Sequence, residues 1–152
     1  MDSRGQVSAE YIFLILIFLI VLTSVTIPFA GNAISSSQNV SVASDAQTAI
    51  SSIGNAVGVV YGNGPGAKRT VNVYVPQNTI LSYNNNAIFL NLNGIPVNAS
   101  NPTGTQRTTV NSSVPYVVSV TPATGAVTKG WHNFAIAWGV GNSTITVTID
   151  PT

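Results

Sequence analysis

The apolar residues of the chain are concentrated near its N-terminus. Every residue from Tyr11 to Leu22 is apolar, and residues 23–30 are apolar at half of their positions. The polar residues and the proline that interrupt this second part are Thr23, Ser24, Thr26 and Pro28. The twenty residues from Tyr11 to Ala30 are long enough, as a helix, to cross about 30 Å of hydrocarbon. The pattern therefore predicts a transmembrane helix over residues 11–30.

A second apolar pattern follows, with the spacing of an amphipathic helix. Between residues 43 and 60, apolar residues recur at steps of three and four, which places them on one face of a helix. They are Ala43, Ala46, Ile50, Ile53, Val57 and Val60. The simplest interpretation is one long helix over residues 6–60, from about Gln6 to about Val60, bent near Pro28 and Gly31. The turn-forming sequence YGNGPG at residues 61–66 is expected to end it.

The rest of the chain, residues 61–152, alternates apolar and polar positions in short runs, which is typical of strands. The expected strands are Thr70–Pro76, Ala87–Gly94, Val114–Val120, Trp131–Trp138 and Ser143–Ile149. A further weak strand is expected around Gln106–Val110, within the long loop Asn98–Ser113. Short strands joined by polar turns predict a small antiparallel sheet or sandwich, with residues 43–60 packed on its inner face. The fold class is therefore α+β: a long N-terminal helix with a hydrophobic first half, and a β-rich head.

Composition and charge exclude several functions. Charged residues make up 6% of the chain, the net charge is +1 and there is no cysteine. So weak a charge does not attract nucleic acid, and without cysteine there is no thiol chemistry. The pair Lys68 and Arg69 is too small for a DNA-binding surface and is expected to be solvated.

The titratable residues do not form a catalytic pattern. The chain has one histidine, His132, and three of its acidic residues, Glu10, Asp45 and Asp150, lie far apart in sequence. A lone histidine in a strand is more often structural than catalytic. No set of residues has the spacing of a metal site, and no phosphate-binding loop is present. We expect no enzymatic activity, no metal and no cofactor.

Two ordinary explanations exist for the N-terminal apolar run. One is a secretory signal peptide, with Gly31–Ala33 as a small-residue cleavage site; the product would then be a secreted β protein that starts at Ile34. Against a signal peptide, the residues before the run carry almost no net charge. The positive charges of Arg4 and the terminal amine balance the negative charges of Asp2 and Glu10. The other is a permanent single-span anchor that carries a cell-surface binding domain.

A third explanation comes from the residues around Gly5. The sequence RGQVSAEYIFL (residues 4–14) resembles the class III signal peptide of archaeal type IV pilins. That pattern is a short basic leader that ends in glycine, then Gln-x-Ser-x-Glu and a leucine four residues after the glutamate. The residues that match it are Arg4, Gly5, Gln6, Ser8, Glu10 and Leu14. Archaellins lack the Gln-x-Ser-x-Glu series, so the resemblance favours a pilin.

This resemblance implies a processing route. A prepilin peptidase would remove the leader, residues 1–5, by cutting between Gly5 and Gln6, and the apolar segment would stay attached. In the pilin family, the glutamate at the position of Glu10 pairs with the α-amine of a neighbouring subunit, here that of Gln6. The physical chemistry agrees, because a carboxylate among apolar side chains needs a countercharge.

The resemblance also implies partners and a location. The precursor would sit in the cell membrane, and residues 11–30 would then form the core of a helical filament of identical subunits at the cell surface. An assembly ATPase and a membrane platform protein would act as partners. Surface adhesion is the cellular role that we expect.

Finally, the head carries two possible surface features. Asn-x-Ser/Thr sequons, which accept N-glycans in surface loops, occur at Asn39, Asn98, Asn111 and Asn142. The better candidates are Asn98 and Asn111, in the predicted long loop, and Asn142, in a turn. Aromatic residues can offer a sugar- or surface-binding patch, although core packing is expected for most of them. They are Tyr74, Tyr83, Tyr116, Trp131 and Trp138.

Overall fold

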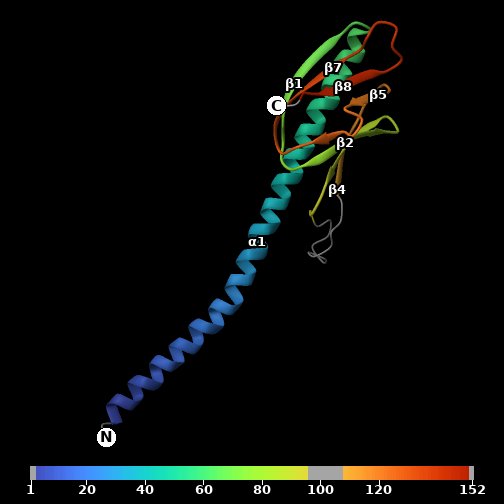
Figure 1. The fold of residues 1–152 in the computed structure, drawn as a ribbon. Helices are drawn as coiled ribbons and strands as arrows, with labels where there is room; N and C mark the ends of the chain where they lie inside the picture. The colour runs from blue at the N-terminus through green and yellow to red at the C-terminus, as the bar shows by residue number, and fades with distance from the viewer. Residues whose placement is uncertain (1–2, 96–107, 151–152) are drawn as a thin grey trace. The chain divides into compact units, whose positions relative to one another are not determined.

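The computed structural model describes residues 3–95 and 108–150 and contains one helix followed by strands (Figure 1). The helix, α1, spans Ser3–Asn63. The strands are β1 (Lys68–Val75), β2 (Thr79–Asn84), β3 (Ala87–Leu92), β4 (Thr108–Ser113), β5 (Val118–Thr121), β6 (Ala126–Val127), β7 (Gly130–Ala137) and β8 (Ile145–Ile149). This confirms the α+β class, in the arrangement of a type IV pilin-like fold.

The chain divides into two compact units, Met1–Gln38 and Asn39–Thr152. The first unit consists of the N-terminal part of α1. The second unit, called the head below, contains the rest of α1 and all the described strands. The helix begins and ends three residues beyond the expected limits, at Ser3 and Asn63. Its C-terminal end is as the turn sequence predicted: Gly64 has a φ of 83°, and its N–H donates to the carbonyl of Val60 over 3.1 Å, a common way to end a helix.

The strands of the head form two four-stranded sheets, with the orders β1-β7-β8-β5 and β4-β3-β2-β6. Strands β1 and β7 pair antiparallel along their whole lengths, from Lys68 opposite Ala137 to Val75 opposite Gly130. The other described pairs are also antiparallel, except β5 and β8, which run parallel. Of the two arrangements expected, a small antiparallel sheet or a sandwich, the head has two sheets, with one parallel pair among the antiparallel ones.

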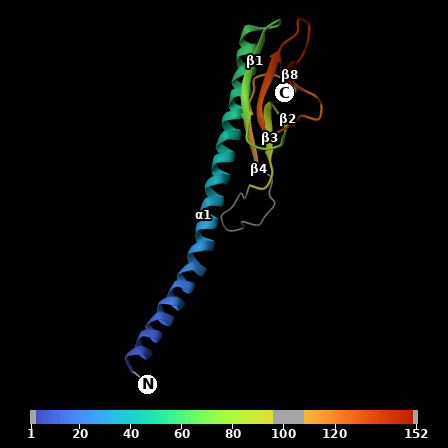
Figure 2. The same cartoon turned by 60° about the vertical axis from the view of Figure 1, so that its left-hand side comes forward.

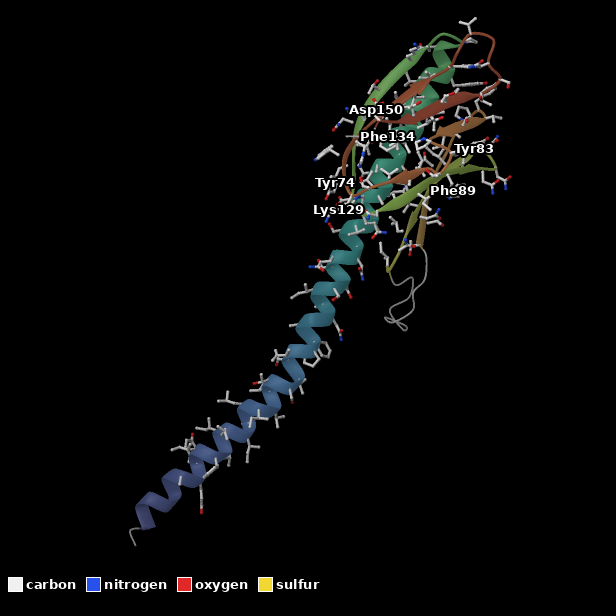
Figure 3. The ribbon with its side chains drawn as sticks, in the orientation of Figure 1. Tyr74, Tyr83, Phe89, Lys129, Phe134 and Asp150 are labelled. Atoms are coloured by element: carbon white, nitrogen blue, oxygen red, sulfur yellow. The ribbon has the colours of Figure 1, made fainter. Side chains whose placement is uncertain are left out.

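The inner faces of the two sheets and one face of α1 form the core of the head. The stripe predicted on the helix is confirmed: Ala46, Ile50, Ile53, Val57 and Val60 are buried, and Ala43 is partly buried. The sheets contribute alternate residues of their strands, as the alternation of apolar and polar positions predicted. Those that are fully or almost fully buried include Val73, Val75, Ile88, Leu90, Leu92, Phe134, Ile136, Ile145, Val147 and Ile149. Figure 3 shows Phe134 in the interior of the head.

The helix lies against the edge strands of both sheets. On one side, Gln47 Nε2 donates to the backbone carbonyl of Asn111 on β4 over 3.2 Å, and Gly54 faces Ser112 on the same strand. On the other side, Ala49 and Val73 of β1 line one shallow pocket, and Figure 2 shows α1 running beside β1. Edge strands carry unpaired backbone groups that invite association. The head part of α1 therefore covers the core and also lies next to one edge strand of each sheet.

Gly54 is the residue that permits this close approach. A Cβ atom placed on it would lie 2.9 Å from the Cβ of Ser112 and would collide with the Ser112 hydroxyl. The glycine weakens the helix locally, but its missing side chain leaves the room that the Ser112 side chain occupies between the helix and β4.

Two of the strand predictions were wrong in part. The segment Val114–Val120 is not one strand: β4 ends at Ser113 and β5 begins at Val118. Pro115 lies between them, and Val114 N–H donates instead to the carbonyl of Asn86 over 2.8 Å. Proline has no N–H for a sheet ladder, so the chain changes sheets at this point. The weak strand expected at Gln106–Val110 is β4, which starts at Thr108; residues 106 and 107 lie outside the described residues.

Strands β2 and β6 were not expected. In β2, Thr79 and Leu81 are buried, and a turn of two residues connects the strand to β3. At its centre, Asn85 and Asn86 have φ values of 45° and 58°. Asparagine tolerates this left-handed conformation, and two such residues suit a tight hairpin.

Candidate functional site

The residues of the proposed processing motif lie in the first turns of α1. The backbone of Arg4, Gly5, Gln6 and Ser8 is helical, and the side chains of residues 3–8 lie outside the described part. Glu10 is exposed, one helical turn beyond Gln6. No charged residue occurs between Glu10 and Asp45. Glu10 is thus the last charge before the apolar segment, and its side chain is exposed.

The apolar segment that follows has no partner within its own unit. Its large hydrophobic side chains, from Tyr11 to Phe29, are between 42% and 77% exposed. Their helix is long and apolar enough to cross a membrane, and the most apolar stretch of that helix is not buried at all in the structure. So much exposed apolar surface is not stable in water. The segment therefore needs lipid or other apolar helices around it.

The hydroxyl groups in this segment are satisfied inside the helix. The side chains of Thr23, Ser24 and Thr26 donate to the carbonyls of the preceding turn over 2.5, 2.9 and 2.7 Å. In an apolar medium a polar group without a partner costs several kcal/mol, and these local bonds avoid that cost. The three residues are therefore compatible with the transmembrane helix predicted from the sequence.

A shallow apolar groove runs along one face of the same segment. It is lined by Leu16, Leu19, Ile20, Thr23, Ser24, Ile27 and Pro28. Pro28 lies inside the continuous helix α1, where its missing N–H deprives the carbonyl of Ser24 of its usual donor. Small polar residues beside bulky aliphatic ones suit close packing of another helix.

The sequons differ in accessibility. Asn111 is exposed, but it lies on β4 and not in a loop as predicted. Asn142 is exposed in the turn between β7 and β8, as predicted. Asn39 is half-buried on α1, and Asn98 lies outside the described residues. Accessibility thus leaves Asn111 and Asn142 as the described sites best placed for a glycan.

The aromatic residues of the head form two groups. Tyr61, Tyr116 and Trp138 pack together, with ring centroids 4.8 to 5.8 Å apart, and Trp138 Nε1 donates to the carbonyl of Asn142 over 2.8 Å. Tyr74 and Trp131 form the second group, at the pocket beside α1. Tyr61 was missed in the sequence because it was assigned to the turn at residues 61–66, whereas it lies in the last turn of α1, which ends at Asn63.

His132 has a structural position. It is buried, and its Nε2 lies 2.9 Å from the carbonyl of Thr128, to which it donates. Its Nδ1 is buried without a hydrogen-bond partner in the structure. Within the part of the chain that the structure describes, no group of three or more potential ligand side chains is close enough to hold a metal. Lys68 and Arg69 are exposed at the start of β1.

The N-terminal segment matches a known family. Residues 3–29 match the family model of the class III signal peptide. This match supports a type IV pilin-like precursor, and it implies processing by a prepilin peptidase and pilus assembly in general. Together with the apolar helix, it is compatible with a membrane-anchored precursor. The chain matches no curated protein and no solved structure.

Proposed function

We propose that this chain is a structural subunit of an archaeal type IV-like pilus that acts in surface adhesion. A prepilin peptidase cuts between Gly5 and Gln6, and the subunits polymerise outside the membrane through residues 11–30. The observation that supports this most strongly is the unpartnered apolar helix that follows a class III signal peptide. An assembly ATPase and a membrane platform protein supply the energy and the site of assembly.

Glu10 gives the proposed assembly a specific contact. It is exposed at the start of an apolar helix, and cutting at Gly5 creates a new amine at Gln6. In the filament, the Glu10 carboxylate pairs with the amine of a neighbouring subunit. The pair removes the cost of placing either charge among apolar helices.

The position of the cut separates this proposal from the secreted alternative. N-terminal sequencing or intact mass of the native protein is expected to give Gln6 as the first residue. A first residue of Ile34 would mean an ordinary signal peptide and a free β head, and the proposal would be wrong. Electron microscopy of sheared surface fibres then distinguishes a filament subunit from an anchored monomer.

The substitution Glu10→Gln tests the pairing. We expect normal cleavage but a large loss of incorporation into fibres, measured by immunoblotting of the sheared fraction against the membrane fraction. The control is Glu10→Asp, which keeps the charge and should retain part of the incorporation. If the glutamine variant enters fibres at the wild-type level, the pair of amine and carboxylate plays no part in assembly.

A further inference from the structure

A pocket lies between α1 and the edge strand β1 in the head. It has a volume of about 250 Å³, slightly below the roughly 300–1,000 Å³ of typical small-molecule sites. Its functional side chains come from three separate segments: Asp45, Thr48 and Ser52 from α1, Asn72 and Tyr74 from β1, and Trp131 from β7. Figure 3 shows Tyr74 at the side of the head. The size suits one small ring.

One wall of the pocket is aromatic. Tyr74 and Trp131 are directly opposed in the register of β1 and β7, with ring centroids 5.5 Å apart and planes inclined at 55°. Trp131 is 61% exposed, although burial of its large apolar surface would stabilise the protein. The exposed indole face therefore offers an apolar platform to a ligand.

Hydrogen-bond acceptors line the rest of the pocket, with Asn72 on the same face of β1 as Tyr74 and the others on α1. Asp45 is an exposed carboxylate on α1. Asn72 donates its side-chain N–H to Asn133 Oδ1 over 2.8 Å, so its own Oδ1 is held as an acceptor. The hydroxyls of Thr48 and Ser52 donate to helix carbonyls over 3.0 and 2.8 Å. Each hydroxyl oxygen keeps lone pairs that can accept.

We infer that this pocket binds a neutral pyranose ring of a surface saccharide. Such a ring has an apolar C–H face that lies on an aromatic platform, and a rim of hydroxyl groups that donate to carboxylate, amide and hydroxyl oxygens. Among the described residues, Asp45 is the one charged residue that lines the pocket, and its negative charge disfavours acidic sugars. The inference rests on the adhesive role proposed above, to which it adds a class of ligand.

The test is a titration of the full-length chain in dodecylphosphocholine micelles, which contain no sugar. The probes are the methyl glycosides of glucose, galactose and mannose. The chain has two tryptophans, so its ¹⁵N spectrum has two indole signals, one of which lies outside the pocket. We expect a saturable shift of the Trp131 signal, with a dissociation constant on the order of 1 mM, and an unchanged Trp138 signal.

Matched variants identify the contacts. Trp131→Ala, followed through the backbone amide signals of the pocket because the indole reporter is then absent, should abolish binding, whereas Tyr61→Ala, at the other aromatic group, should not. Asp45→Asn keeps the shape of the side chain and should weaken binding by about tenfold, because bonds to a charged acceptor are stronger. The control is Asp150→Asn, which changes an exposed carboxylate of the head outside the pocket and should leave binding unchanged.

Two results would overturn the inference. One is the absence of any shift of the Trp131 signal with all three glycosides well above the expected constant. The other is protection of Trp131 from acrylamide quenching in assembled fibres of a Trp138→Phe variant, which would make a second copy of the chain the occupant. The titration uses unassembled protein, so a failure of polymerisation would not be mistaken for a failure of binding.

Discussion

The two parts of α1, residues 11–30 and residues 43–60, differ in how their apolar side chains can be kept away from water. In residues 11–30, apolar side chains surround the helix and are exposed. In residues 43–60, they form a single stripe that is buried or partly buried in the head. An amphipathic helix finds its cover within its own chain, whereas a helix that is apolar all round needs a cover from outside. One continuous helix therefore combines part of a folded domain with a segment that needs an apolar environment from outside.

The largest expected effect on the stability of the head comes from shortening a buried isoleucine in the second part of α1. The same change in the first part serves as the comparison. Ile50→Ala leaves a cavity in the core of the head, where the side chain is fully buried, and should lower the free energy of unfolding by about 2–5 kcal/mol. Urea unfolding followed by tryptophan fluorescence measures this, because both tryptophans lie in the head.

The matched change is Ile20→Ala, at a side chain that is 60% exposed. It should leave the unfolding of the head unchanged and reduce the yield of fibres instead. If it destabilised the head as much as Ile50→Ala, the two parts of the helix would not be independent in the way proposed.

A smaller effect is expected at the contact between α1 and β4. Gly54→Ala adds a Cβ that collides with Ser112 and should lower the free energy of unfolding by about 1–3 kcal/mol. Urea unfolding of the variant, compared with that of the double variant Gly54→Ala and Ser112→Gly, should show partial rescue.

Gly58→Ala is expected to raise the free energy of unfolding, whereas Gly54→Ala is expected to lower it. Nothing lies within 4 Å of a Cβ placed on Gly58, so the better helix propensity of alanine should stabilise the head by up to about 1 kcal/mol. Equal effects of the two alanines would show that Gly54 matters only for local helix propensity and not for packing.

The smallest effect concerns hydroxyl groups in the two units. Thr79 is buried, and its Oγ1 donates to the carbonyl of Asn91 over 2.6 Å, so Thr79→Val should cost about 1 kcal/mol of unfolding free energy. Thr26→Val removes only a bond within one helical turn and should leave the urea midpoint of the head unchanged. A shift of that midpoint by Thr26→Val would show that the two units are coupled.

Much of the fold follows from short-range patterns. The apolar run, the stripe on residues 43–60 and the alternation in β1, β3, β7 and β8 can be recognised without knowledge of any partner, because each depends on neighbours a few residues apart. The same holds for the class III signal peptide, whose matched residues all lie within residues 3–29. These features determine the class of the fold and support a type IV pilin-like precursor.

The pairing of strands needed the tertiary structure. The division of Val114–Val120 at Pro115 and the parallel pairing of β5 with β8 depend on residues that are far apart in sequence. Strand β2 has only a weak alternation, and its position is set by β3 and β6 on either side. Burial against distant elements decided these features, because local propensity does not specify which strands meet.

The candidate sites also differ in whether the sequence or only the tertiary structure reveals them. The sequence by itself placed Gly5, Gln6 and Glu10 in one linear motif, since such a motif depends only on residues that are close together in the chain. Only the tertiary structure put Asp45 and Asn72 beside Trp131, and only it showed why Gly54 is a glycine. The physical reason is that a helix and two strands must pack before their side chains can share a pocket or exclude a methyl group.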